Sequence, residues 1–223
     1  MKPHKAIVSW SSGKDCAFAL HEVRRTGGYD IAGALTTVTE TFGRVSMHGV
    51  REEILRAQLA AARLPPLIVP IPWPCPNETY EARMADAVRD ARAQGVTHMI
   101  FGDLFLEDVR AYRERKLAGT GIAPVFPLWG RPTDKLARDM IASGLEARLV
   151  CVDTGQVDEN FAGRTFDEAL LRDLPPSADP CGENSEFHTC VTGGPMFSRS
   201  VVVTPGEVVR RDQFVYADLV LAG

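Results

Sequence analysis

The sequence predicts an α/β fold in which a Rossmann-like parallel sheet, flanked by helices, is followed by a smaller α+β domain. Apolar, β-branched runs alternate with segments of helical periodicity up to about residue 120. Residues 6–20 combine a strand, a turn of small residues and a helix. After Gly121 prolines interrupt this pattern, and the rest of the chain is rich in β segments. We therefore expect two domains, residues 1–122 and residues 123–223.

The first domain is expected to contain four strands and four helices. Short apolar runs predict strands at 7–10, 31–38, 67–71 and 97–101. Apolar residues at helical spacing predict helices at 15–26, 50–63, 77–94 and 107–117. Gly27 and Gly95 mark the ends of two helices, and Asn77 is expected to cap a third. Six of the 15 prolines lie at 65–76, which excludes a helix there.

The second domain begins with a strand-like run at 123–128 that prolines interrupt. A helix is expected at 132–143, followed by a strand at 145–152. Thr165 and Glu168 are spaced as a capping box, which predicts a helix that runs to about residue 174. The remainder is expected to be β-rich, with strands at 200–203 and 214–221 and a turn at 204–206.

The composition is that of a soluble globular protein of 223 residues, 45% hydrophobic and 24% charged. A net charge of −4 argues against a general nucleic-acid-binding protein, which would normally carry a basic face. Five cysteines without a Cys-x-x-Cys pair predict free thiols in a reducing, cytoplasmic compartment. We see no signal-peptide pattern and no run of 18 apolar residues, so we expect no membrane partner.

The turn between the first strand and the first helix has the residues expected of a phosphate-binding loop. Helix N-termini present unpaired N–H donors and a positive dipole to an anion. Lys14 adds a cation, whereas Asp15 would repel a phosphate unless Mg²⁺ lay between them. The pattern therefore predicts a nucleotide bound with Mg²⁺. The residues expected to contact it are Ser9, Trp10, Ser11, Ser12, Gly13, Lys14, Asp15 and Cys16.

Two common phosphate-binding patterns do not fit this chain. The Walker pattern has a Ser or Thr after its Lys, where this chain has Asp15. The dinucleotide fingerprint needs three spaced glycines, and Pro124 occupies the third position after Gly119 and Gly121. An ordinary strand-to-helix turn remains an alternative for residues 9–16.

The loop at 11–16, Ser-Ser-Gly-Lys-Asp-Cys, resembles the pyrophosphatase loop of N-type ATP pyrophosphatases, which reads Ser-Gly-Gly-x-Asp-Ser. This resemblance implies a parallel sheet of the HUP type, the fold of adenine nucleotide alpha hydrolase-like proteins. Two positions depart from the pattern. Ser12 replaces a Gly and must avoid or tolerate a positive φ. Cys16 replaces a Ser and offers a weaker donor.

A second region resembles the C-terminal signature of the diphthine–ammonia ligase (diphthamide synthetase) family. It consists of residues 179–189, Asp-Pro-Cys-Gly-Glu-Asn-Ser-Glu-Phe-His-Thr, and of Gly-Pro-Met-Phe at 194–197. Ser185 stands where that family usually has Gly. Further similar segments lie at 44–49, 101–104 and 127–129, so the resemblance extends over nearly the whole chain.

This resemblance implies an ATP-dependent ligase. ATP and Mg²⁺ would activate a carboxylate as an acyl-adenylate, pyrophosphate would leave, and ammonia would displace AMP to form an amide. The family's acceptor is diphthine on elongation factor 2, and free ammonium would supply the nitrogen. Open alternatives are an ATP pyrophosphatase that acts on another carboxylate or on tRNA, a sulfur-transferring enzyme, and a non-catalytic adenine-nucleotide-binding protein. A homo-oligomer also remains open.

Ligands of an open parallel sheet bind at the carboxyl ends of its strands, near the point where the strand order reverses. Thr36 and Thr37 end the second strand, where the resemblance implies backbone contacts to adenine or ribose. Gly102 would let a ligand approach the chain. Asp103, together with Asp15, is the expected Mg²⁺ ligand, although Asp103 could equally cap the next helix.

Arg44 and His48 follow the second strand in a polar loop, where they could contact phosphate or an acyl-adenylate. A plain surface loop is the alternative. Arg110 and Arg113 lie three residues apart on one helix, and a solvated face is the alternative to contact with pyrophosphate.

The candidate catalytic residues are Lys14, Asp15, Glu183, Glu186 and His188. Lys14 would stabilise the departing pyrophosphate. Glu183 and Glu186 are three residues apart, and they could orient ammonium or take a proton from ammonia, with His188 assisting. A solvated turn is the alternative. Cys181 and Cys190 have no base at a recognisable spacing, so we expect buried thiols rather than nucleophiles.

Overall fold

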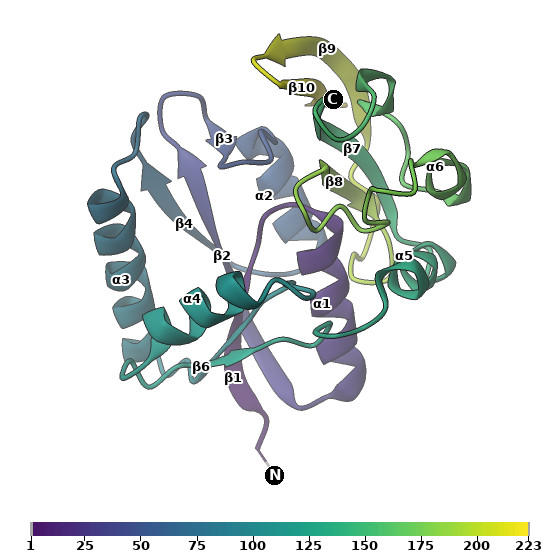
Figure 1. The fold of residues 1–223 in the computed structure, drawn as a ribbon. Coiled ribbons are helices and arrows are strands. Elements are labelled where there is room, and N and C mark those ends of the chain that lie inside the picture. Colours follow the sequence, from purple (N-terminus) through teal and green to yellow (C-terminus); the bar gives the residue numbers. More distant parts are fainter. Residues whose placement is uncertain (1, 223) are drawn as a thin grey trace.

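A computed structural model of the chain describes residues 2–222 (Figure 1). Sheet A contains five parallel strands in the order β4-β2-β1-β5-β6. Their bounds are β1 His4–Ser9, β2 Tyr29–Thr39, β4 Pro66–Ile71, β5 His98–Ile100 and β6 Ala123–Val125. A two-residue strand, β3 (Arg44–Val45), pairs antiparallel with the end of β2. The strand order reverses between β1 and β5, which confirms the predicted Rossmann-like sheet.

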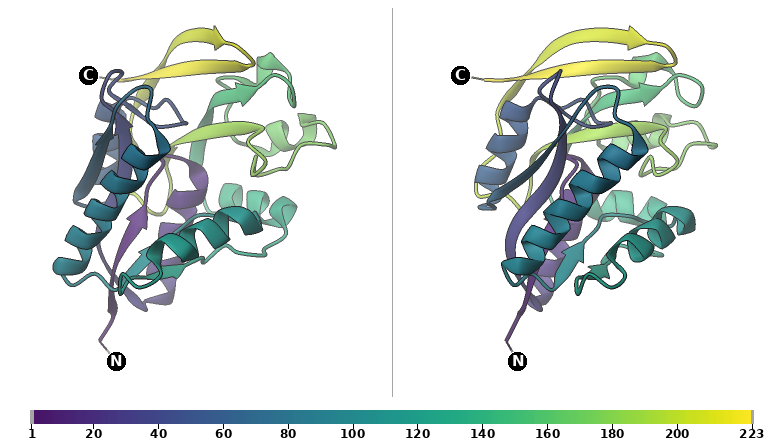
Figure 2. Two further views of the ribbon diagram at one scale, coloured as in Figure 1. Left: turned by 60° about the vertical axis from the view of Figure 1, so that its left-hand side comes forward. Right: turned by 90° about the vertical axis from the view of Figure 1, so that its left-hand side faces the viewer.

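Helices cover both faces of sheet A (Figure 2). They are α1 Lys14–Thr26, α2 Glu52–Ala61, α3 Asn77–Ala93 and α4 Glu107–Leu117. Because side chains alternate along a strand, Ala6 and Val8 of β1 belong to the core that includes α1 and α2, whereas Ile7 belongs to the core that includes α3 and α4. The apolar runs of the sequence are therefore strands buried on both faces.

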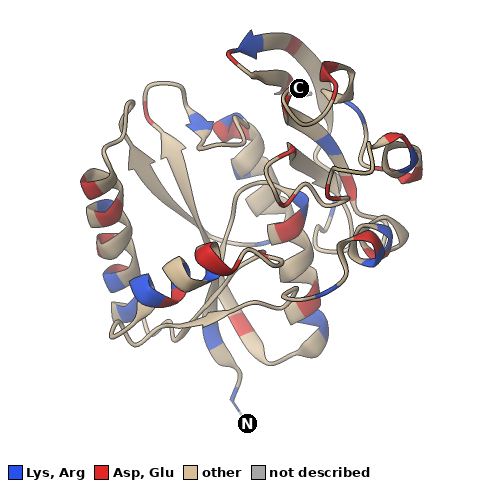
Figure 3. Cartoon of the chain, viewed as in Figure 1, with Lys and Arg blue, Asp and Glu red and all other residues tan. Residues whose placement is uncertain are grey.

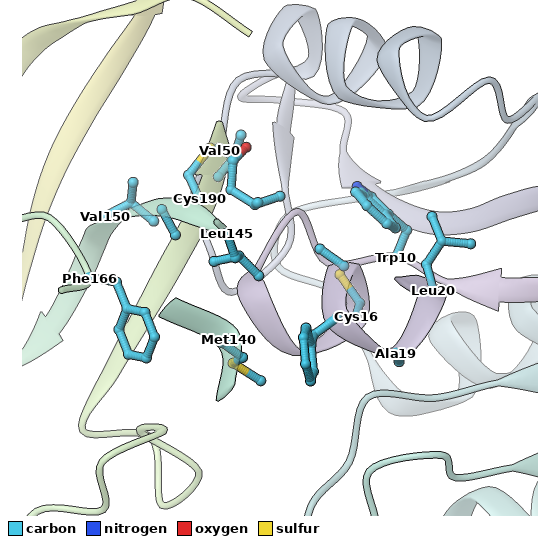
Figure 4. Close-up of a cluster of buried hydrophobic side chains, with 14 of the residues drawn as sticks. Trp10, Cys16, Ala19, Leu20, Val50, Met140, Leu145, Val150, Phe166 and Cys190 are labelled. Carbon is cyan, nitrogen blue, oxygen red and sulfur yellow. Dashed lines mark hydrogen bonds between the residues drawn. The ribbon is translucent and has the colours of Figure 1, made fainter. Parts of the chain in front are cut away.

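The C-terminal part forms sheet B, an antiparallel sheet in the order β8-β7-β10-β9. Its strands are β7 Glu146–Asp153, β8 Phe187–Gly193, β9 Val203–Arg211 and β10 Phe214–Leu221. Around it lie α5 (Thr133–Ala142), the 3₁₀ turn η1 (Glu159–Phe161) and α6 (Glu168–Asp173). Sheet B shares a hydrophobic core with β1 and α1: Trp10, Cys16 and Leu20 lie in the same cluster as Met140, Leu145 and Phe166 (Figure 4).

Strand β6 lies just beyond residue 122, yet it is hydrogen-bonded to β5 as the edge of sheet A. The first strand of sheet B is β7. The division of the chain into domains at 122 and 123 stays a prediction.

Four local predictions were wrong. The strand expected at 200–203 begins only at Val203, as β9. Pro76 rather than Asn77 is the N-cap of α3, and no side chain caps that helix. Asp167 rather than Thr165 caps α6, because its Oδ1 accepts the N–H of Leu170 at 2.8 Å. The predicted turn at 204–206 lies inside β9, where Pro205 pairs with Leu219. An edge strand tolerates proline, because its outer N–H groups have no partner strand.

Among residues 2–222, no helix has both the length and the apolar character required to cross a membrane.

Candidate active site

A cavity of about 200 Å³ lies where β1 and β5 end, at the reversal of strand order. Its walls come from the loop before α1, from the segment after β5, from α4 and from residues 182–189. Ten of the seventeen predicted site residues line it: Ser9, Ser11, Lys14, Asp15, Cys16, His48, Gly102, Asp103, Glu183 and His188. The two sequence motifs, about 170 residues apart in the chain, therefore meet at one site.

The loop before α1 is docked onto strand β8. The carbonyl of Ser12 accepts the N–H of Val191 at 2.9 Å, and the Oγ1 of Thr189 accepts the N–H of Lys14 at 3.0 Å. Ser12 has a φ of 71°, the left-handed conformation that the usual Gly at this position adopts freely. Its side chain is buried, and its Oγ has no hydrogen-bond partner among the described residues. The first helical N–H is thus satisfied by the protein itself.

Lys14 points into the protein rather than into open solvent. Its side chain is 2% exposed, and Nζ donates to both carboxylate oxygens of Asp15, at 2.9 and 2.8 Å, and to the carbonyl of Cys181. The ammonium also lies over the rings of Phe166 and Phe187, 5.5 and 5.6 Å from their centroids. Burial opposes the charged form most strongly, but Asp15, Cys181 and Glu183 together more than offset burial and raise the pKa of Lys14. Lys14 is therefore a buried cation that orients Asp15.

Two histidines form one wall of the cavity. The rings of His48 and His188 lie 4.7 Å apart, and His48 packs on Gly13, where a Cβ would approach its Cε1 to 2.7 Å. Burial, with a contribution from His188, lowers the pKa of His48 to about 3, and burial lowers the pKa of His188 to about 4. Nδ1 of His48 lies 3.1 Å from the carbonyl oxygen of Thr189. Because a carbonyl oxygen can only accept a hydrogen bond, Nδ1 is the donor and carries the proton. Its Nε2 is then an acceptor.

The segment after β5 closes the opposite wall. Gly102 packs against α1, because a Cβ there would lie 2.7 Å from the backbone C of Asp15 and the N of Cys16. This close approach of two backbones gives Gly102 a structural role besides its place at the cavity. Asp103 pairs with Arg113 of α4 at 3.2 Å, and both side chains line the cavity. Arg110 instead lies over the rings of Phe126 and Trp129.

The two signature glutamates have different environments. Oε1 of Glu183 accepts the N–H of Leu104 at 2.8 Å, and burial raises the pKa of Glu183 to about 7 against the effect of this bond. Glu186 is almost completely buried and does not line the cavity. Its Oε1 accepts the N–H of Asp179 at 2.7 Å and the side-chain amide of Asn184 at 3.1 Å. Glu186 thus stabilises the loop from Asp179 to Asn184, and Glu183 faces the cavity.

The remaining predicted residues lie elsewhere. Trp10 is a core residue whose Nε1–H donates to Oε1 of Gln58 at 3.1 Å. Thr36 is buried, and the carbonyl of Thr37 accepts the N–H of Ser46 at 3.1 Å. Arg44 pairs with Asp218 at 2.7 Å in a separate groove. Ser12, Gly13 and Glu186 support the cavity without lining it.

The cysteines match the expectation of buried thiols. Cys181 and Cys190 are buried, and all five cysteines are free. Burial raises the pKa of Cys16 to about 11 and that of Cys190 to about 12, so these thiols are protonated at neutral pH.

A metal ion would need ligands beyond the protein. In the part of the chain that the structure describes, no three His, Cys, Asp or Glu side chains gather as a metal site. Asp15 keeps 27% of its side chain exposed and lines the cavity with Asp103. Mg²⁺ commonly takes one or two carboxylates and completes its shell with phosphate oxygens and water. Asp15 is bound by Lys14 and Asp103 by Arg113, so an Mg²⁺ ion would share both carboxylates with these cations, and the Mg²⁺ site stays a prediction.

Among the cavity residues that the sequence analysis did not select as site residues, two contact Lys14. Thr189, the last residue of the first signature segment, binds the N–H of Lys14, and Phe187 lies against the Lys14 ammonium. Both positions are visible in the signature Glu-Phe-His-Thr, but an uncharged residue gave no chemical reason to select them.

Comparisons with known proteins find one family model and several relatives. Residues 132–218 match the family model of the diphthamide synthase C-terminal domain. The chain is similar to the diphthine–ammonia ligase of Schizosaccharomyces pombe, with 32% identity over 40% of this chain and 15% of that protein. It is also similar to the human diphthine–ammonia ligase, with 31% identity over 40% of this chain and 35% of that protein. The matches thus span a minor part of each relative's length.

The family match contains α5, strands β7 to β9 and the loop that carries Glu183. It therefore covers the cavity-lining residues between 182 and 189 and strand β8, on which the loop before α1 docks. The similarity to the diphthamide synthase family is thus shown for residues 132–218 of the chain.

Proposed function

We propose that this protein is an ATP-dependent ligase that forms an amide from a carboxylate and ammonia, with diphthine on elongation factor 2 as the acceptor. One observation carries the proposal: the loop at 11–16 and the carboxylate of Glu183 line the same cavity at the switch point of sheet A. The two relatives described above are diphthine–ammonia ligases, which agrees in reaction class. A cavity of about 200 Å³ is smaller than most ligand clefts, so a nucleotide would extend beyond it.

In the first step, a carboxylate oxygen of the acceptor attacks the α-phosphorus of ATP. The bond between that phosphorus and the bridging oxygen breaks, and pyrophosphate leaves with the electron pair. Ser9, Ser11 and the guanidinium of Arg113 line the cavity and would bind the phosphate oxygens. Asp15 and Asp103 would hold Mg²⁺, which lowers the repulsion between the phosphates and the carboxylates. Lys14 would act through Asp15, because its ammonium is already bound within the protein.

In the second step, ammonia attacks the carbonyl carbon of the acyl-adenylate, and the bond to the AMP oxygen breaks. The attacking nitrogen must lose a proton. Glu183 is the proposed base, since a pKa of about 7 suits proton transfer at neutral pH. His188 and the free Nε2 of His48 are neutral acceptors that would orient ammonia.

The test is an assay of product with ATP, Mg²⁺, ammonium and diphthine-bearing elongation factor 2. We expect AMP, pyrophosphate and an acceptor mass that corresponds to the amide. Asp15→Asn is expected to lose Mg-ATP binding by calorimetry. Glu183→Gln is expected to bind ATP and to form amide slowly. Glu114→Gln, an exposed carboxylate on α4, is the matched control. Recovery of intact ATP would contradict the ligase and favour a nucleotide-binding protein, whereas AMP without amide would point to another acceptor.

A further inference from the structure

A second, larger cavity is lined by residues of the β3–α2 region and of the hairpin of β9 and β10. Figure 1 shows where these elements lie in the fold. This groove has a volume of about 590 Å³ and shares no lining residue with the candidate active site. Its floor is apolar, because the buried side chains of Val50, Ile54 and Leu219 form it. The groove therefore needs an explanation that the proposed reaction does not supply.

The rim of the groove exposes large apolar side chains. Seven large hydrophobic residues are exposed among residues 2–222, and four of them line this groove: Phe42, Met47, Trp73 and Val209. Trp73 is 65% exposed and Met47 is 75% exposed. The rings of Phe42 and Trp73 lie 5.8 Å apart, so the aromatic surface is continuous. Such a concentration on one face is typical of a surface that binds another protein.

The same groove carries an excess of positive charge. Arg44 and Arg51 share the single carboxylate of Asp218, at 2.7 and 2.6 Å, so one guanidinium charge is left over. Arg211 lies over the ring of Phe42 at 5.8 Å. Glu207 supplies the other acidic side chain of the lining. Figure 3 marks the basic residues of β3 and of the end of β9. This local balance is positive in a chain whose net charge is −4.

The groove is separated from the candidate active site by one short loop. Met47 and Gly49 line the groove, whereas His48, between them, lines the active-site cavity. Met47 and Gly49 both have a left-handed backbone, with φ values of 67° and 69°. A partner in the groove would therefore lie one loop away from the cavity.

We propose that this groove is a docking site for a partner protein that presents an acidic segment with apolar side chains. The aromatic and methionine side chains would bind the apolar residues of the segment, and the arginines would bind its carboxylates. A small anion alone is a poorer fit, because Arg44 and Arg51 stay partly exposed and the rim is mainly apolar. This inference goes beyond the proposed ligase reaction and holds independently of it.

The experiment measures the anisotropy of fluorescein-labelled peptides mixed with the full chain, without ATP. One peptide is a short run of glutamates interrupted by leucines, and the other has Lys in place of every Glu. We expect the acidic peptide to bind and the basic peptide to bind at least tenfold more weakly. Trp73→Ala is expected to weaken acidic-peptide binding about tenfold, as an exposed aromatic anchor would. Arg211→Gln is expected to weaken it and to reduce its salt dependence.

Val202→Ala and Arg56→Gln are the matched controls. Val202 is an equally exposed apolar residue outside the groove, and Arg56 is an exposed arginine on the far side of α2 from the groove lining. Equal binding of the two peptides, or equal effects of Trp73→Ala and Val202→Ala, would overturn the proposal. Sedimentation velocity is the last measurement. If the chain forms a dimer that Trp73→Ala abolishes, and neither peptide binds, the groove would be assigned to a second copy of the chain instead. None of these readouts depends on ATP turnover, so failure here is distinct from failure of the ligase proposal.

Discussion

The carboxylate of Glu183 accepts a hydrogen bond from the backbone N–H of Leu104 at 2.8 Å. Leu104 follows Asp103 in the segment after β5, whereas Glu183 belongs to the loop before β8. The bond therefore fixes a titratable carboxylate from the C-terminal part at the switch point of sheet A. The same side chain lines the candidate active-site cavity.

Glu183→Gln should change how stability depends on pH. The pKa of Glu183 is about 7 in the folded protein and 4.5 as its ordinary value. A raised carboxyl pKa stabilises the folded state below the ordinary pKa, and this contribution is lost as pH rises through 7. Gln still offers an oxygen to Leu104 but does not titrate. We expect the wild type to lose stability relative to Glu183→Gln between pH 4.5 and pH 7, measured by urea unfolding. Parallel curves would contradict this.

Ser12→Gly and Ser185→Gly should each stabilise the protein. The two serines have φ values of 71° and 68°, and both stand where the related motifs have Gly. A left-handed backbone costs a non-glycine residue about 1–2 kcal/mol, which a substitution by Gly relieves. Gly also loses more backbone entropy on folding, which offsets about 0.5–1 kcal/mol of this gain. We expect a gain of about 1 kcal/mol for each, by chemical denaturation. Ser143→Gly is the control, since Ser143 has a φ of −71° and should lose stability instead.

The histidine wall should make the protein sensitive to acid. The pKa values of His48 and His188 are lowered to about 3 and about 4, from an ordinary value of 6.5. When the pKa of a histidine is lower in the folded protein, the free energy of unfolding is highest above pH 6.5. It falls as the pH drops toward the pKa of the folded state, because the unfolded chain takes up the proton first. His48→Asn keeps a donor near the Nδ1 position without titrating. Its unfolding free energy should fall less than that of the wild type between pH 7 and pH 4.5. An equal fall in both proteins would remove His48 from the acid response.

The sequence predicted the parallel sheet well because its signals are local. The apolar run of β1 and the glycine after α1 are read directly from neighbouring residues. Sheet B depends on pairing between distant residues. The sequence around Pro205 therefore predicts a turn, although Pro205 lies in an edge strand. A proline signals a turn locally, and only the partner strand decides whether it is one.

The site was predicted in part, for a related reason. Glu183 and Glu186 are close in sequence, and their spacing suggested one shared role. Ser185, which has a left-handed backbone, lies between them. In the structure Glu183 binds the N–H of Leu104 after β5, whereas the buried Glu186 binds the N–H of Asp179. Thr189 was missed because its role, a hydrogen bond to the N–H of Lys14, requires β8 to dock on a loop 175 residues earlier.

Lys14→Met tests whether Lys14 supports Asp15 or faces the ligand. With its ammonium bound to Asp15 and to the carbonyl of Cys181, removal of the charge would leave Asp15 partly buried and unpaired. Breaking a buried ion pair costs about 3–5 kcal/mol, and the 27% exposure of Asp15 puts this case near 3 kcal/mol. Lys135→Met, which breaks an exposed pair on α5, is the control and should cost less than about 1 kcal/mol.

The double variant Lys14→Met, Asp15→Asn completes that test. It removes both charges of the pair, so it should regain much of the stability that Lys14→Met loses, measured as the urea midpoint at neutral pH. A cation that served only a phosphate ligand would behave differently: the single variant would then be as stable as the wild type without nucleotide, and its defect would emerge only as weaker Mg-ATP binding. Stability loss in the single variant together with recovery in the double variant therefore separates the two roles, because only a structural ion pair couples the two substitutions in the absence of ligand.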